Sequence, residues 1–166
     1  TCLELSCSDT VTAVGVGYIA QLPLLEDLDL HGCTAITDEG IAALSKGASA
    51  DILRALKLSR VTITDRACAD VSQLRCLRLL WLGSSSSPNH IPYISCAGLD
   101  HLSRLVSLEC LTLSHCGGVS SVSALARFPR LLKLAFERMT FCGTDLATFA
   151  TCAQLQHLNM RRCTFV

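Results

Sequence analysis

Leucines recur along the chain in one spaced pattern, L-x-x-L-x-L, with a shortened first copy at Leu3-Leu5. Counting one aromatic and one methionine in place of leucine, the six full copies are Leu25-Leu28-Leu30, Leu53-Leu56-Leu58, Leu77-Leu80-Leu82, Leu108-Leu111-Leu113, Leu131-Leu134-Phe136 and Leu155-Leu158-Met160. The last apolar position of successive copies advances by 25, 28, 24, 31, 23 and 24 residues. A fixed apolar pattern at such a period is typical of repeat proteins, whose stacked units share one core. The sequence therefore predicts a stack of about seven units with one long open surface.

The copy that starts at Leu25 shows what one unit contains. Its last two leucines alternate with polar residues, which predicts a strand with one buried side. Thr37 and the acidic Asp38 and Glu39 predict a helix start, because Thr can cap a helix and acidic side chains favour its positive end. We expect the helical segment to stop at Gly47, where the chain returns to the next strand.

One insertion breaks the regular spacing. Residues 83–93 are rich in Ser, Gly and Pro and lie between the fourth strand and its helix, which predicts a loop. Insertions in repeat proteins fall on one face and often contribute to binding. Two roles therefore stay open for this loop: it contacts a partner, or it folds back over Trp81.

The residues Leu25 through Cys33 follow the motif L-x-x-L-x-L-x-x-N/C-x-L, and the chain resembles the leucine-rich repeat superfamily over essentially its whole length. The run L-x-L-x-x-C-x-x-I-T-D-x-G-I-x-x-L is most similar to the cysteine-containing subclass, in the divergent style of protist proteins. The resemblance implies an α/β solenoid shaped like a horseshoe. Its parallel β-sheet would form the concave face, and short helices or loops the convex face.

The expected domain organisation is a single leucine-rich repeat domain over residues 1–166, cut from a longer chain and without caps. End repeats need a polar outer face for solubility, so we expect more chain or a partner at each end. For the same reason we expect the 166 residues alone to dissolve poorly.

Eleven cysteines first suggest a disulfide-stapled secreted domain. Three of them, however, hold one repeat position: Cys33, Cys116 and Cys163 each lie three residues after the last strand apolar residue. A buried cysteine behaves as a small apolar residue, so this recurrence favours a packing role. It also favours a reducing, intracellular and cytoplasmic location, with disulfides as the alternative.

The polar positions between the strand leucines give the candidate binding surface. These candidates are Asp27, Asp29, His31, Lys57, Leu79, Trp81, Lys133, Glu137, Arg138, His157 and Arg161. Charge is graded along the chain: the acidic residues Glu4, Asp27 and Asp29 come early and the basic residues Lys133, Arg138, Arg161 and Arg162 come late, with Glu137 as the exception. Such a gradient would orient a partner of opposite polarity, although solvated polar residues with no partner would look the same.

Trp81, the single Trp, stands beside Leu79 near the middle of the predicted sheet. Trp is enriched in binding hot spots, which tend to lie at interface centres. We therefore expect Trp81 to contact a partner, unless the neighbouring insertion covers it.

Enzyme, cofactor and metal functions find little support. The chain has no G-x-S-x-G, P-loop, G-x-G-x-x-G or H-E-x-x-H motif. His115 with Cys110 and Cys116 lacks a fourth ligand nearby in the sequence, which argues against zinc. The net charge of zero gives no general attraction to nucleic acid or to an anionic membrane.

The favoured function is a non-catalytic scaffold or adaptor that binds proteins through the concave sheet within a larger assembly, without cofactors. The cysteine-containing subclass includes F-box adaptors, so a substrate receptor of a ubiquitin ligase is the first alternative. Nucleic-acid binding through the late basic surface is the second alternative. The small number of aromatic residues argues against it.

Overall fold

The structure is a computed structural model that describes residues 1–83 and 94–166. Seven strands form one parallel sheet and follow each other in chain order. They are β1 (Cys2–Glu4), β2 (Asp27–Asp29), β3 (Ala55–Ser59), β4 (Leu79–Gly83), β5 (Cys110–Ser114), β6 (Lys133–Glu137) and β8 (His157–Arg161). Each strand carries the end of one copy of the leucine pattern, so the prediction of one strand per copy is confirmed.

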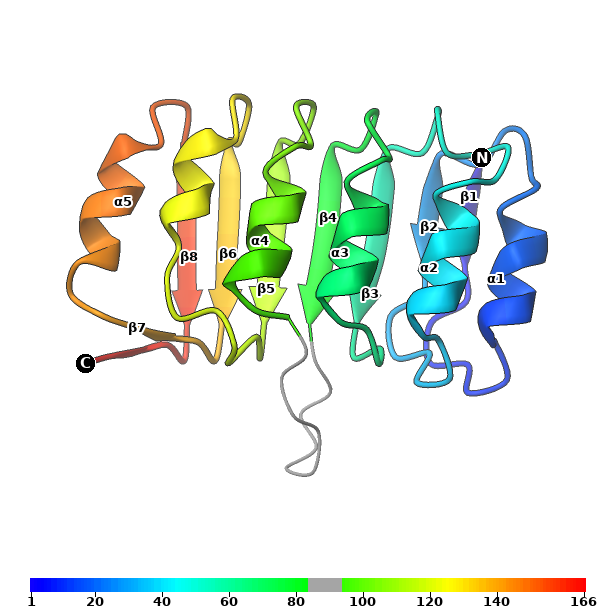
Figure 1. Cartoon of the computed structure of the whole chain (residues 1–166), viewed down its shortest axis with the longest axis horizontal. Helices are drawn as coiled ribbons and strands as arrows, with labels where there is room; N and C mark the ends of the chain where they lie inside the picture. The colour runs from blue at the N-terminus through cyan, green and yellow to red at the C-terminus, as the bar shows by residue number, and fades with distance from the viewer. Residues whose placement is uncertain (84–93) are drawn as a thin grey trace.

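Short helical segments lie on one face of this sheet and leave its other face open (Figure 1). The α-helices are α1 (Ala13–Ile19), α2 (Asp38–Leu44), α3 (Asp65–Val71), α4 (Cys96–Leu102) and α5 (Asp145–Thr151). The fifth unit returns through a 3-10 helix, η1 (Ser123–Arg127), because its return segment is shorter. Parallel strands joined by helices on one side form the predicted α/β leucine-rich repeat solenoid.

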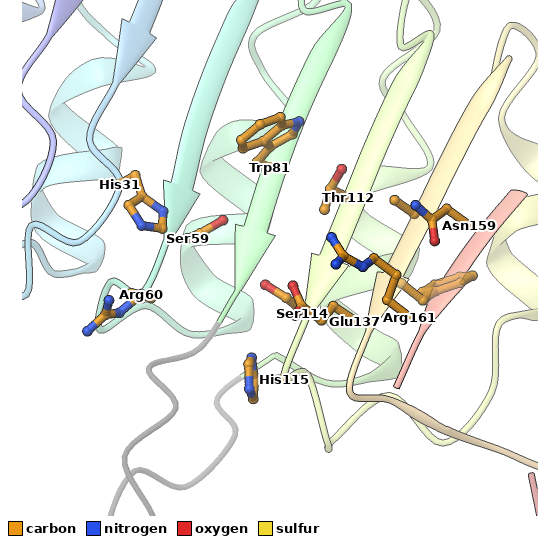
Figure 2. Close-up of a pocket in the computed structure, with 12 residues that line it drawn as sticks. His31, Ser59, Arg60, Trp81, Thr112, Ser114, His115, Glu137, Asn159 and Arg161 are labelled. Atoms are coloured by element: carbon orange, nitrogen blue, oxygen red, sulfur yellow. The ribbon is translucent and has the colours of Figure 1, made fainter. Parts of the chain in front are cut away.

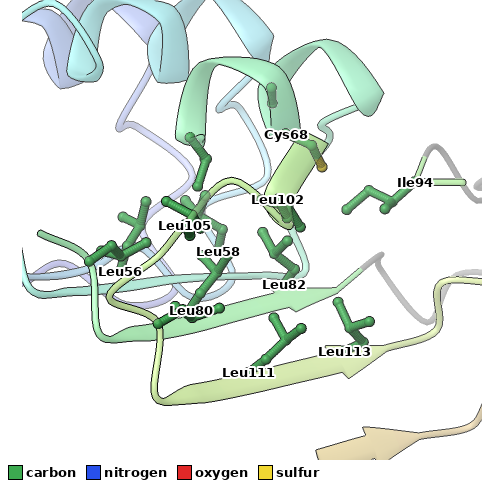
Figure 3. Packing of buried hydrophobic residues seen from close by; sticks show 14 of the residues in the cluster. Leu56, Leu58, Cys68, Leu80, Leu82, Ile94, Leu102, Leu105, Leu111 and Leu113 are labelled. Atoms are coloured by element: carbon green, nitrogen blue, oxygen red, sulfur yellow. The ribbon is translucent and has the colours of Figure 1, made fainter. Parts of the chain in front are cut away.

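The leucines that define the pattern stack across the sheet in register. Leu56 pairs with Leu28 on one side and with Leu80 on the other, and the same row continues to Leu111 and Leu134. Each of these side chains is at most 2% exposed, and Figure 3 shows how they meet the inner side of the helices. Full burial of one such side chain contributes about 1.5–3 kcal/mol. At the last strand, Leu158 has a neighbouring strand on one side and is 42% exposed.

Aspartates at the helix starts connect one unit to the next. The carboxylate of Asp38 accepts hydrogen bonds from Thr64 N–H and Thr64 Oγ1 at 2.8 and 2.6 Å. Asp65 accepts from the N–H and hydroxyl of Ser95 at 2.8 and 2.5 Å. Each carboxylate therefore holds the residue that precedes the following helix, and these bonds set the spacing of neighbouring helices.

Thr37 stands at the N-cap of α2, as predicted, but its side chain makes no capping hydrogen bond. Its hydroxyl donates to Glu39 Oε2 at 2.5 Å and accepts no backbone N–H. The hydroxyls of Thr64 and Ser95, in contrast, do accept a backbone N–H of their own helices. Those two hydroxyls are oriented by Asp38 and Asp65, which are the first residues of the preceding helices. The first residue of the helix that precedes α2 is Ala13, which has no carboxylate to orient Thr37.

Gly47 lies where the chain turns back to the next strand, as predicted, but for a different reason. A Cβ at this position would lie 2.3 Å from the carbonyl oxygen of Ala20 in the preceding unit. Its φ lies outside the left-handed region, so no helix-ending turn requires a glycine here. Close packing between units explains the residue.

A left-handed residue follows six of the seven strands of the large sheet at one fixed position, two residues after the last strand apolar residue; the equivalent position after β4 lies outside the described residues. This left-handed column consists of Cys7, Gly32, Arg60, His115, Arg138 and Arg162, with φ between 52° and 76°. Five of the six donate their backbone N–H to a carbonyl of the following unit, as in Arg60 N to Gly83 O at 2.8 Å. A non-glycine residue in this conformation costs roughly 1–2 kcal/mol.

The structure adds a two-stranded sheet that the leucine pattern did not predict. Its strands are β7 (Thr140–Phe141) and β9 (Thr164–Phe165), which pair in parallel at the last two units. The rings of Phe141 and Phe165 lie 5.9 Å apart, and Phe141 also contacts Phe136 at 4.8 Å. Aromatic packing replaces leucine packing at this end of the core.

The recurring cysteine position points inward, as predicted. Cys33 and Cys116 are buried, and so are Val61 and Met139, which replace cysteine in other units. Cys33 Sγ donates a hydrogen bond to the carbonyl of Leu5 at 3.0 Å. None of the eleven cysteines, all of which lie in the described ranges, forms a disulfide bond.

We expect Asp65→Ala to lower the free energy of unfolding by about 2 kcal/mol, because two donors on Ser95 lose a charged acceptor. Urea denaturation checks this value, with Asp70→Ala in the same helix as the control. Among the described residues no side-chain partner is found for Asp70. Equal losses in the two variants would contradict the role of the carboxylate.

Candidate protein-binding surface

The face of the sheet that carries no helices is called the open face here. Its polar positions lie in register, so one side chain from each strand falls in a single row across the middle of the sheet. This central row consists of Glu4, Asp29, Lys57, Trp81, Thr112, Ala135 and Asn159. The row places acidic, basic and aromatic side chains on three consecutive strands, followed by small side chains.

Asp29, Lys57 and Trp81 form one connected set. Lys57 Nζ lies 2.8 Å from Asp29 Oδ2 and 4.9 Å from the centre of the Trp81 ring. The backbone N–H of His31 donates to Asp29 Oδ1 at 2.9 Å. The Lys57 ammonium therefore bridges a carboxylate and an aromatic face, which is a favourable cation–π arrangement.

This set changes the pKa values of its two charged groups. Burial alone would raise the pKa of Asp29, but the hydrogen bonds from Lys57 and His31 and the Lys57 charge lower it below its usual value. The hydrogen bond to Asp29 raises the pKa of Lys57. Both groups are therefore charged at neutral pH, and Asp29 is neutralised by its partner.

Trp81 is 38% exposed on the open face, while Leu79 beside it is half-buried. One face of the indole is occupied by Lys57 from the neighbouring strand. The insertion was expected to contact a partner or to cover Trp81, and its residues 84–93 lie outside the described part of the chain. Both of its roles stay predictions.

Beyond Trp81 the open face is hollowed by two adjoining pockets of about 390 and 350 Å³. Both are lined by Trp81, Thr112, Ala135 and Asn159, so they meet along the central row. Figure 2 shows Trp81, Thr112 and Asn159 in the first of these pockets. The small side chains of Thr112 and Ala135 form the floor, while larger side chains stand on β4 and β8. Three strand spacings of about 4.8 Å separate those strands, so this open-face groove is about 14 Å wide.

The charges that line the open-face groove are mainly positive. Arg60, Lys133 and Arg161 line it together with one carboxylate, that of Glu137. None of these three cations lies within 4.0 Å of a carboxylate in the described part of the chain. The groove thus carries unpaired positive charge, although the whole chain is neutral.

Three histidines also line the groove: His31 and His115 at one end and His157 at the other. The Nε2 atom of His115 is buried without a hydrogen-bond partner. Burial, and then the nearby charge of Arg138, lower the pKa of His115, so its ring is neutral at pH 7. Across the described ranges 1–83 and 94–166, no three His, Cys, Asp or Glu residues are placed to hold a metal ion.

The structure brings most of the sequence candidates together and leaves two aside. The groove is lined by His31, Leu79, Trp81, Lys133, Glu137, His157 and Arg161, and Asp29 with Lys57 flanks it. Asp27 lies on β2, away from the groove. Arg138 belongs to the left-handed column just past β6.

The sequence placed five further groove residues on the outward side of the strands without predicting a groove there: Ser59, Thr112, Ser114, Ala135 and Asn159. It missed Arg60. Arg60 follows the last strand leucine by two residues, the position that Arg138 holds in its own unit. Comparing equivalent positions of the repeats would therefore have identified it. The small residues of the groove floor gave no such signal. A small side chain contributes to a groove only when larger side chains stand around it, and the sequence does not show which side chains those are.

A family-model match supports the repeat assignment over part of the chain. The leucine rich repeat family model matches residues 21–45. No curated protein matches the chain. Among solved structures, an internalin from Listeria monocytogenes is similar, with 19% identity and a TM-score of 0.39. The match covers 99% of this chain and 62% of the internalin chain.

No helix in the described segments is long and apolar enough to cross a bilayer.

We expect Lys57→Met to lower the free energy of unfolding at pH 7 by about 1 kcal/mol, through the lost ion pair and cation–π contact. The folded-state pKa of Asp29 is lowered, so its contribution is present above the unfolded pKa of about 3.9 and is lost as the pH falls through the folded value. The difference between variant and wild type should therefore shrink toward pH 3. Urea unfolding followed by the fluorescence of the single Trp measures it, with Lys46→Met as control. A loss that is equal at pH 7 and pH 3 would assign the effect to packing instead.

Proposed function

Since the chain has a leucine-rich repeat fold, we propose that it is a non-catalytic scaffold or adaptor that binds a protein partner through the open face of its sheet. This face corresponds to the concave side of the solenoid. The binding surface would be the open-face groove with Trp81 at its wall. Such a module would work within a larger assembly.

One observation carries this proposal: the exposed Trp81 is held in place at the edge of a preformed groove. Lys57 fixes one face of the indole and is itself fixed by Asp29, so Trp81 loses little side-chain freedom on binding. Immobilising a free side chain costs about 0.5–1.5 kcal/mol in an interface. Pre-organised aromatic anchors beside a pocket are typical of binding hot spots.

The dimensions of the groove suit a segment of polypeptide. A width of about 14 Å accepts an α-helix with its side chains, about 10–12 Å across, or an extended strand. The mixed lining, with apolar Leu79 and Ala135 beside charged Lys133 and Arg161, resembles a protein interface more than a pocket for a small apolar ligand.

The two alternatives have less support. Nucleic acid binding relies on phosphate neutralisation and on aromatic stacking platforms. The chain has zero net charge, and Trp81 is the aromatic residue that lines the groove with an exposed ring. The ubiquitin-ligase alternative rests on the family resemblance alone, and none of the described residues bears on it.

We expect Trp81→Ala to weaken partner binding by about 2 kcal/mol, or about thirtyfold, as for a hot-spot residue. The test compares proteins captured by immobilised wild type and variant from a lysate of the producing cells. A captured partner would then be bound to both forms in titration calorimetry.

Tyr18→Ala is the matched control, because Tyr18 is an exposed aromatic residue on the helical side, 75% exposed. Circular dichroism verifies that both variants are folded. A partner that is lost with Trp81→Ala and retained with Tyr18→Ala supports the open face. Retention by both variants, or loss with Tyr18→Ala alone, would place binding elsewhere.

A further inference from the structure

Arginine side chains gather at the end of the open face where the strands finish. Arg60, Arg138 and Arg162 belong to the left-handed column, and Arg161 is the last residue of β8. All four side chains are exposed. We call these four residues the arginine rim; Figure 2 shows Arg60 and Arg161 at the groove.

The fold requires the left-handed backbone at these positions but does not require arginine. Gly32 occupies the same column at no conformational cost, because glycine has no Cβ. An arginine there is disfavoured by the same sterics that make left-handed helices rare. Strained positions are kept where the side chain serves a purpose, so the recurrence of arginine calls for one.

Intramolecular ion pairing does not supply that purpose. Within the described residues, no carboxylate lies within 4.0 Å of any rim guanidinium. The undescribed segment 84–93 contains neither Asp nor Glu in its sequence. Four arginines elsewhere do have carboxylate partners within the chain, as Arg54 has with Glu26 and Arg78 with Glu109. The rim charges are therefore available to a partner.

The spacing of the column defines the shape of that partner. Arg60 and Arg138 each donate their backbone N–H to the last residue of the following strand, so equivalent positions of neighbouring units are one strand spacing apart. Arg60 and Arg162 follow β3 and β8, four spacings of about 4.8 Å apart, or about 19 Å. An extended segment of about six residues covers this length.

We propose that the arginine rim binds an extended acidic segment of a protein partner, with its Asp or Glu carboxylates on the guanidinium groups. The inference rests on the proposed function, since it specifies the chemistry of the partner bound at the open face. Guanidinium groups pair with carboxylates through two parallel hydrogen bonds, which favours Arg over Lys at such a site. Trp81 is the one exposed Trp, Tyr or Phe among the described groove residues, which favours a peptide over nucleic acid stacked on several aromatic rings.

The test measures fluorescence anisotropy of a labelled hexaglutamate peptide with the 166-residue chain at low salt. The double variant Arg60→Gly/Arg138→Gly removes two charges and relieves two left-handed residues. It should bind the peptide about fivefold more weakly, as for the loss of two exposed ion pairs. Its urea midpoint should not fall below that of the wild type, so a binding loss cannot be ascribed to unfolding.

The matched control is Arg104→Ala/Arg130→Ala, which removes two exposed arginines from the segments that lead into β5 and β6. These segments lie at the end of the sheet where the strands begin, opposite the arginine rim. A second double variant, Arg60→Lys/Arg138→Lys, keeps the positive charges but cannot form two parallel hydrogen bonds to one carboxylate. It should bind with intermediate affinity. Equal weakening in the control, or no binding of the peptide to the wild type, would overturn the inference. An oligouridylate that displaces the peptide at lower concentration would overturn it in favour of nucleic acid.

The outcome for the rim is separable from that for the proposed function. Loss of a captured partner with Trp81→Ala, together with unchanged binding in the rim variant, would retain the open face and discard the acidic segment. Rim-dependent peptide binding without any effect of Trp81→Ala on a captured partner would retain the rim and discard the Trp81 anchor.

Discussion

Stacking in register is the constraint on which the rest of this structure depends. A single unit has one strand and one short return segment, and neither can bury its leucines without a neighbour. The row from Leu28 to Leu134 shows the consequence, since each leucine is closed off by the equivalent residue of the units on both sides. Once that row is set, every other position of the repeat is also aligned with its equivalents. Side chains far apart in sequence thereby become neighbours in rows across the sheet.

The alignment explains both the contacts that hold neighbouring helices together and the arrangement of charged and aromatic side chains on the open face. Asp38 and Thr64 are 26 residues apart in the chain, and Asp29 and Lys57 are 28 apart, yet each pair is joined by a hydrogen bond. In the first pair the contact holds two helices together, and in the second it fixes Lys57 beneath an exposed aromatic ring. The same geometry therefore serves stability on the helical side and recognition on the open face.

The leucine pattern was enough to predict the fold. A strand whose apolar residues alternate with polar ones must turn its apolar side to the core, and this leaves few possible arrangements of strands and helices. It also placed Trp81 and Lys133 on the correct face. The Asp29–Lys57 pair was not predicted, since the two residues were considered as separate surface candidates rather than as register partners. The pairing of β7 with β9 was missed for a different reason: Thr-Phe is too short to show periodicity, and its partner follows two dozen residues later. The groove depends on the sizes of Thr112 and Ala135 relative to their neighbours, which only the assembled sheet reveals.

The left-handed column separates what the backbone needs from what the side chain provides. The turn after each strand needs φ near +60°, and glycine would meet that need most cheaply. Arginine at Arg60, Arg138 and Arg162 retains the turn and adds a charge at the mouth of the groove. A repeat protein can change those side chains without disturbing the core, because they are exposed and the backbones of Arg60 and Arg138 are fixed by hydrogen bonds to the next strand. The leucine rows hold the stack together whatever side chain stands in the column, so surface charge and folding are controlled by different residues of the same repeat.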